Sequence, residues 1–218
     1  MIRVLLVDDH ELVRTGISRL LNDADDIEVV AEADTGEKAI QLVRENTPDV
    51  VLMDVNMPGI GGLEATTKLL KVHPELKVII VTVHIEEPFP TRMLKAGAMG
   101  YLTKGCAIDE IIKAIRTVNN GKRYVASDVA QELAMSMLPG GDKSPFDSLS
   151  QRELQVMLMV TQGDKIQAIA DQLHLSAKTV STYRYRLFEK LGVNSDVELT
   201  HLAIRHGMLE SQSENNNS

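Results

Sequence analysis

The sequence has 218 residues, which suits two domains better than one, because single domains usually hold about 100–150 residues. Its only cysteine, Cys106, excludes an internal disulfide and is typical of a reducing compartment. The net charge of −8 makes the chain a poor general binder of polyanions, so contact with nucleic acid requires a local basic patch. No apolar stretch reaches the roughly 20 residues of a membrane span, which favours a cytoplasmic protein without membrane contact.

Residues 2–119 alternate short apolar runs with segments of helical periodicity, a pattern typical of βαβ units around a parallel sheet. Several runs consist almost entirely of Val, Ile, Leu and Met, as expected of strands covered on both faces. We therefore expect an α/β domain with a doubly wound, five-stranded parallel sheet. Its strands are predicted at residues 2–8, 27–32, 49–53, 77–82 and 99–102. The first helix is predicted from the apolar stripe Leu12, Val13, Ile17, Leu20 and Leu21.

The rest of the chain changes character after residue 120. Residues 121–147 are predicted to be a linker with a short helix at 128–137, followed by a Pro- and Gly-containing stretch that ends regular structure. Residues 148–210 show only helical patterns and predict an all-α domain of four helices. The polar residues 211–218 predict a disordered tail.

Polar residues stand at the ends of four predicted strands. Asp8 and Asp9 follow the first strand, Asp54 the third, Thr82 ends the fourth, and Lys104 follows the fifth. Ligands of parallel sheets bind outside the carboxyl ends of the strands, so these side chains are expected to converge. Carboxylates suit Mg²⁺, and a carboxylate can attack phosphorus to form an aspartyl phosphate. The pattern predicts Asp54 as the nucleophile, with Thr82 and Lys104 contacting the phosphoryl group.

These motifs resemble the receiver domain of two-component response regulators over residues 1–120. The resemblance is carried by Asp8-Asp9, Asp54 with the following Met57-Pro58-Gly59, Thr82, Tyr101 and Lys104. It implies a flavodoxin-like fold and a sensor histidine kinase as phosphodonor. It also implies self-catalysed transfer to Asp54 and autodephosphorylation as the only enzymatic activity. Mg²⁺ would bind directly to Asp9, Asp54 and the backbone carbonyl of Asn56, and to Asp8 through water.

The same resemblance implies a conformational switch. Thr82 would move toward the phosphoryl group while Tyr101 turns inward. His84 lies two residues after Thr82, where receivers tune the lifetime of the phosphate. Lys104 is followed by Gly105 instead of the proline that many receivers carry, so a cis peptide should not be assumed there.

The C-terminal half contains a helix-turn-helix pattern. Ser150 and Glu153 predict a capping box at its first helix. A tight turn at residues 174–176 joins two helices, and the second, residues 177–190, would enter the major groove of DNA. Four basic side chains against Glu189 give this segment a charge of +3 within an acidic chain, as phosphate contacts require.

Residues 149–154, 176–180 and 190–193 resemble the LuxR-type DNA-binding domain of the NarL/FixJ response regulators. Residues 179–186 and 196–207 are similar to the GacA/UvrY subgroup. The resemblance implies that Ser181, Thr182 and Tyr185 face bases. Phosphates would be held by Lys178, Thr179, Arg184 and Arg186, with Lys190 adding positive charge. On this reading, loss of Arg184 weakens binding to all DNA sequences alike, whereas loss of Thr182 changes sequence preference.

The favoured interpretation is a phosphorylation-dependent transcriptional regulator that binds promoter DNA as a dimer, with residues 196–206 as the dimer face. The subgroup resemblance implies activation of small regulatory RNA genes. Two alternatives stay open. A phosphohydrolase of the haloacid-dehalogenase type also uses an aspartate nucleophile, but it needs a second acid where this chain has Asn56. In the other alternative, the C-terminal half makes protein contacts only.

Overall fold

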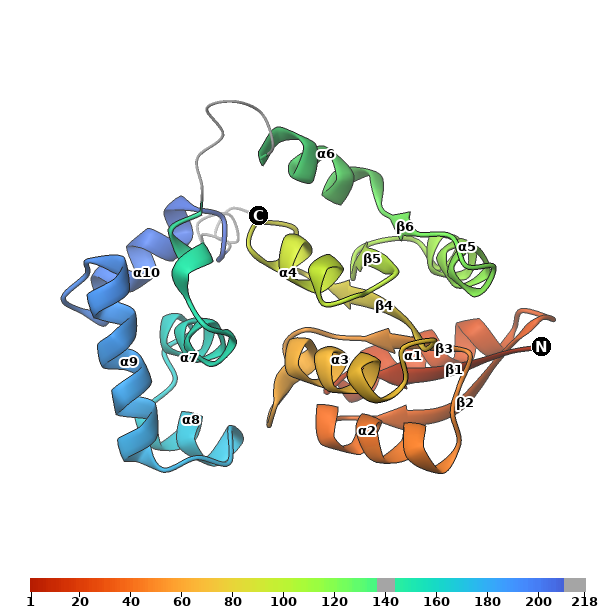
Figure 1. Ribbon diagram of the computed structural model, residues 1–218, viewed down its shortest axis with the longest axis horizontal. Coiled ribbons are helices and arrows are strands. Elements are labelled where there is room, and N and C mark those ends of the chain that lie inside the picture. The colour runs from red at the N-terminus through yellow and green to blue at the C-terminus, as the bar shows by residue number, and fades with distance from the viewer. Residues whose placement is uncertain (137–143, 210–218) are drawn as a thin grey trace, which may run out of the picture. The chain divides into compact units, whose positions relative to one another are not determined.

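The structure is a computed structural model that describes residues 1–136 and 144–209 (Figure 1). The chain divides into two compact units, one from β1 to α6 and one from η1 to α10. None of the described helices is long and apolar enough to cross a membrane. The predicted disordered tail, residues 211–218, lies outside the described residues.

The first unit is built on a parallel sheet with the strand order β2-β1-β3-β4-β5-β6. The five predicted strands are confirmed, and each observed end lies within one residue of its predicted position. Their bounds are β1 Ile2–Val7, β2 Ile27–Ala33, β3 Val50–Met53, β4 Lys77–Thr82 and β5 Gly100–Thr103. All four residues of β3 are buried, as expected of a central strand with helices on both faces.

The sheet has a sixth strand that was not predicted. β6, Tyr124–Val125, lies in the segment predicted as linker and extends the sheet beyond β5. Its pairing is fixed by two backbone hydrogen bonds, from Tyr124 N to Met99 O at 3.0 Å and from Ala126 N to Tyr101 O at 3.0 Å. The helix predicted at 128–137 follows directly as α6, Ser127–Ser136. A strand of two residues is too short to show a periodic pattern.

Five further helices surround the sheet. They are α1 Glu11–Asn22, α2 Gly36–Glu45, α3 Gly61–Val72, α4 Phe89–Lys95 and α5 Ile108–Asn119. Contacts of α2 with α3 and of α3 with α4 form one row, and α1 contacts α5 (Figure 1). The predicted stripe on α1 is only partly correct. Leu21 is fully buried, but Leu12 is 89% and Leu20 47% exposed.

The second unit is the predicted set of four helices, preceded by the 3-10 turn η1 (Pro145–Ser148). The helices are α7 Gln151–Thr161, α8 Ile166–Gln172, α9 Ala177–Leu191 and α10 Asp196–Arg205. The capping box of Ser150 and Glu153 is confirmed. Ser176 is the N-cap of α9, because its hydroxyl accepts a hydrogen bond from Thr179 N. Leu154, Val180, Leu187 and Leu199 are buried in the core of this unit.

Candidate functional site

The sheet brings the predicted site residues to one edge. Strand order reverses at β1, which has β2 on one side and β3 on the other, and ligands of such sheets bind at this point. The strand ladder continues into the residues that follow each strand. Asp54 N donates to Val7 O at 2.9 Å, and Lys104 N donates to Thr82 O at 2.8 Å. Backbone hydrogen bonds to the neighbouring strands therefore fix the positions of the Asp54 and Lys104 backbones, from which their side chains extend.

Asp8 and Asp54 form the buried part of an acidic cluster. They are 3% and 2% exposed, whereas Asp9 lies at the surface. Ligand atoms of Asp8, Asp9, His10 and Asp54 all lie within 4.8 Å of one another. Lys104 Nζ contacts Asp8 Oδ2 at 2.7 Å and Asp54 Oδ2 at 2.8 Å. One ammonium group thus bridges the two buried carboxylates.

Burial and charge act against each other on these groups. Loss of solvation raises the pKa of Asp54 to about 6, although the charge of Lys104 and its hydrogen bond oppose the shift. Burial alone would lower the pKa of Lys104, but its contacts with Asp54 and Asp8 outweigh burial and raise it. Lys104 therefore keeps its positive charge at neutral pH. An added positive ion would stabilise the ionised form of Asp54 further.

The cluster fits a magnesium ion by its chemistry. Mg²⁺ prefers oxygen ligands and commonly uses one or two carboxylates together with water. The partly open Asp9 and the buried Asp54 offer carboxylate oxygens within the same small space. The Asn56 backbone also belongs to this region, because Asn56 N donates to Asp54 Oδ1 at 3.3 Å. These residues are the ones through which the chain would hold Mg²⁺.

Magnesium affinity is expected to depend on pH. Asp54 binds a metal only as a carboxylate, so a proton competes with Mg²⁺ once the pH falls below its pKa of about 6. The Mg²⁺ affinity should be nearly constant above pH 7. Well below pH 6 it should fall roughly tenfold per pH unit, because one proton competes with Mg²⁺ for the Asp54 carboxylate. Calorimetric titration with MgCl₂ between pH 5 and 8 measures this. An affinity that is equally strong at pH 5 and pH 8 would contradict the assignment.

His84 connects the other predicted residues of the site. The Tyr101 hydroxyl donates to His84 O at 2.6 Å, and His84 N donates to Thr82 Oγ1 at 3.4 Å. His84 Nε2 lies 2.6 Å from Asn56 Nδ2, and its ring stacks on Phe89 at 4.5 Å between centroids. Burial, together with the charge of Lys104, lowers the pKa of His84 to about 4. The ring is neutral, so Nε2 accepts from Asn56 and the proton is assigned to Nδ1.

Tyr101 is completely buried in the first unit. The resemblance to receiver domains associates this inward position with the switched form. The Lys104–Gly105 peptide is not among the cis bonds of residues 1–136 and 144–209. The influence of His84 on phosphate lifetime stays a prediction.

Two residues at the site were not predicted. His10 directly follows the aspartate pair, and its Nδ1 lies 3.2 Å from Asp8 Oδ1 and 2.9 Å from Asp9 Oδ1. Glu37 belongs to α2, and its Oε1 accepts from Ile60 N at 3.0 Å at the start of α3. Glu37 thereby fixes the loop that follows Asp54. For His10 the signal was its position beside the acids, whereas no sequence pattern pointed to Glu37.

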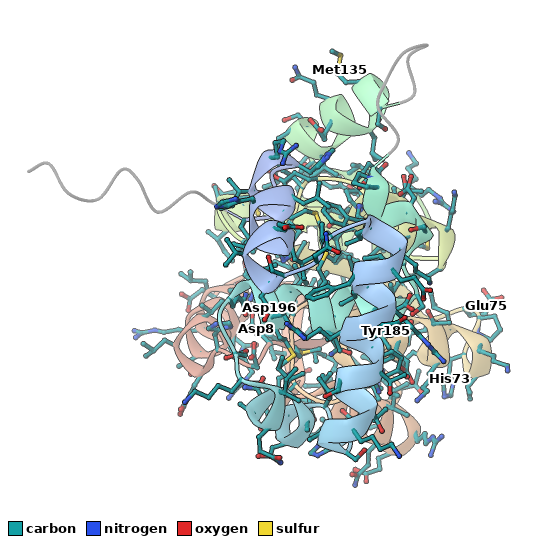
Figure 2. The ribbon with its side chains drawn as sticks, turned by 90° about the vertical axis from the view of Figure 1, so that its left-hand side faces the viewer. Asp8, His73, Glu75, Met135, Tyr185 and Asp196 are labelled. Carbon is teal, nitrogen blue, oxygen red and sulfur yellow. The ribbon has the colours of Figure 1, made fainter. Side chains whose placement is uncertain are left out.

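The candidate DNA-binding surface lies on α9. Its exposed side chains recur at intervals of three and four residues and therefore share one face of the helix. These residues are Lys178, Ser181, Thr182, Tyr185, Arg186 and Glu189, and Lys190 is exposed as well. Tyr185, labelled in Figure 2, is 67% exposed. The three residues predicted to face bases all belong to this stripe. The Ser181 and Thr182 hydroxyls donate to Ala177 O and Lys178 O of their own helix, each at 2.9 Å.

The other three predicted DNA contacts are bonded within the chain as well. The Thr179 hydroxyl lies 2.7 Å from the Ser176 hydroxyl. Arg184 forms an ion pair with Asp196, and Lys190 Nζ contacts the buried Glu153 at 2.6 Å. Each group already satisfies part of its hydrogen-bonding capacity without DNA. Their contact with phosphates stays a prediction.

Comparison with known proteins agrees with the families expected for the two halves of the chain. Residues 4–116 match the response regulator receiver domain, and residues 147–203 match the bacterial regulatory proteins of the luxR family. The chain belongs to the response regulators of two-component systems, in the group whose output is a LuxR-type DNA-binding domain, and it is a transcriptional regulator. The family match favours the receiver over the phosphohydrolase alternative.

Its relatives include response regulator GacA of Pseudomonas aeruginosa, which is 58% identical over 214 residues, covering 98% of this chain and all of that protein. Response regulator UvrY of Escherichia coli is 57% identical over 213 residues, covering 97% and 98% of the two chains. A solved structure of RcsB from Salmonella typhimurium aligns with a TM-score of 0.60 at 26% identity. That alignment covers 94% of this chain and 98% of RcsB.

Proposed function

We propose that Asp54 is the phosphoacceptor and that its phosphorylation controls DNA binding by α9. The observation that carries this proposal is the single ammonium group of Lys104 placed between the buried carboxylates of Asp8 and Asp54. A cation held 2.8 Å from the acceptor oxygen is positioned to pair with a phosphoryl oxygen once that oxygen arrives.

In the proposed transfer, a carboxylate oxygen of Asp54 attacks the phosphorus of a phosphohistidine on the sensor kinase. The new P–O bond forms as the P–N bond breaks, and the histidine leaves with its electron pair. Bound Mg²⁺ would neutralise charge on the phosphoryl oxygens. Lys104 then pairs with a phosphoryl oxygen, and the Thr82 hydroxyl donates to another. Hydrolysis by water later restores the carboxylate and releases inorganic phosphate.

The output step is supported by the surface of α9. Its exposed stripe combines Lys178 and Arg186, which can pair with phosphates, with hydroxyl groups that can reach base edges. A solved RcsB structure is a complex with DNA, and another holds RcsB dimers bound to DNA. By this analogy the chain binds promoter DNA as a dimer in the cytoplasm. Its similarity to GacA and UvrY supports small regulatory RNA genes as targets.

The test is DNA binding with and without Mg²⁺ and beryllofluoride, which mimics the phosphoryl group, in the unmodified chain and in Asp54→Ala. We expect beryllofluoride to make DNA binding dimeric and at least tenfold tighter in the unmodified chain, but not in Asp54→Ala. A factor of ten corresponds to about 1.4 kcal/mol of binding free energy. Equal DNA affinity with and without beryllofluoride would show that the receiver does not control DNA binding. Absence of binding at every salt concentration would favour a C-terminal half that makes protein contacts only.

A further inference from the structure

Arg184 makes a two-pronged contact that joins two helices of the second unit. Its Nε donates to Asp196 Oδ1 at 2.7 Å, and its Nη2 donates to Asp196 Oδ2 at 2.8 Å. The same guanidinium lies over the ring of Phe188, with Cζ 4.5 Å from the ring centroid. Arg184 and Phe188 belong to α9, whereas Asp196 is the first residue of α10 (Figure 2).

The acceptor is itself well fixed. Ser195 precedes Asp196 and caps α10, because its hydroxyl accepts from Glu198 N at 3.2 Å. A carboxylate in the first turn is also stabilised by the positive end of the helix dipole. Exposed ion pairs usually contribute little, but a planar guanidinium with two parallel hydrogen bonds and a stacked ring has a defined geometry. The contact therefore ties the first residue of α10 to the middle of α9.

The same geometry makes Arg184 a poor phosphate ligand. Asp196 neutralises its charge and lies within hydrogen-bond distance, so an approaching phosphate would meet a carboxylate beside the guanidinium. Arg186 has a different environment, because it is exposed and lies on the same face as Lys178 and Tyr185. Two arginines that are two residues apart thus have different surroundings.

We propose that Arg184 is a positioning residue that fixes α10 against the recognition helix α9, and that it does not hold a DNA phosphate. The inference rests on the proposed function of α9 in DNA binding. If α10 is the dimer face, the position of its first turn relative to α9, fixed by Arg184 and Asp196, also influences the separation of the two recognition helices. The pair would then adapt the protein dimer to the spacing of its half-sites.

The first test compares Arg184→Ala, Asp196→Asn and Arg186→Ala in the full chain with beryllofluoride, by measuring DNA affinity over a salt series. Loss of one phosphate contact reduces the salt slope by about one, so Arg186→Ala should weaken binding and flatten the slope. Arg184→Ala and Asp196→Asn should both weaken binding, roughly three- to tenfold, with the slope unchanged. Tighter binding by Asp196→Asn together with a flatter slope for Arg184→Ala would overturn the proposal.

A second measurement does not depend on DNA. Spin labels at Glu189→Cys on α9 and His201→Cys on α10, in a Cys106→Ser background, report the distance between the helices. Both labelled positions are exposed. We expect Arg184→Ala and Asp196→Asn to broaden or shift the distance distribution, whereas Arg186→Ala leaves it unchanged. An unchanged distribution in all three variants would refute the positioning role even if the unmodified chain bound no DNA.

Discussion

Replacing Lys104 with methionine is expected to slow phosphoryl uptake by Asp54 roughly a hundredfold or more, the usual effect of losing one charge-stabilising donor. Methionine keeps similar bulk but removes the cation that contacts Asp8 and Asp54. Without that charge the pKa of Asp54, already raised by burial, rises further and less of the nucleophilic carboxylate is present at neutral pH. Uptake from a small acyl phosphate, followed on gels that retard phosphoprotein, measures the rate.

The same substitution should also lower the free energy of unfolding of the metal-free protein by about 3–5 kcal/mol, because it leaves buried carboxylates without their cation. Lys104→Arg is the matched control. Arginine keeps the positive charge and should recover most of the stability, but its planar group cannot place one nitrogen between both carboxylates, so transfer stays slow. A normal uptake rate in Lys104→Met would show that Lys104 has no part in the transfer.

Gly62→Ala is expected to damage the same site from the backbone side. A Cβ atom at Gly62 would overlap the carbonyl oxygen of Asp54, which is backbone and cannot rotate away. Gly62 N also donates to Val55 O at 3.0 Å, so α3 is held tightly against the end of β3. The added methyl should cost about 1–3 kcal/mol of unfolding free energy by overpacking and should displace the Asp54 backbone, which weakens Mg²⁺ binding.

Gly16→Ala provides the control within the same unit. Gly16 lies in α1, and apart from its chain neighbours and the nearby backbone of its own helix no described heavy atom lies within 4 Å of the position its Cβ would occupy. Alanine there should stabilise the protein by roughly 0.5–1 kcal/mol through its higher helix propensity, with no change in Mg²⁺ affinity. Urea unfolding measures the free energy of unfolding of both variants, and calorimetric titration measures their Mg²⁺ affinity. Equal behaviour of Gly62→Ala and Gly16→Ala would disprove the packing argument.

The periodicity of the sequence was sufficient for most of the fold. The strands of the sheet were predictable because central parallel strands are continuous apolar runs, as in β3. The stripe on α1 misled in part, since Leu12 and Leu20 have the expected spacing but are exposed. Periodicity identifies the apolar side of a helix, but burial depends on what the rest of the chain places against it.

The candidate site was predictable where strand ends define it. Asp8, Asp54 and Lys104 meet because they follow β1, β3 and β5, whose carboxyl ends lie at the same edge of the parallel sheet. Partners from distant elements could not be foreseen in the same way. The family resemblance implied a phosphate contact for Arg184, but it gave no sign of the partner Asp196, which lies on the next helix. Charge in a sequence does not identify which group neutralises it.

The short strand β6 has a consequence for where the first folding unit ends. The receiver family match stops at residue 116, but Ala126 N donates to Tyr101 O, so the ladder of the sheet continues ten residues further. A fragment cut at residue 120 would leave β5 as an open edge with unpaired backbone groups, a template for association with other chains. The first compact unit includes β6 and α6, so a fragment used to study it alone should extend through Ser136.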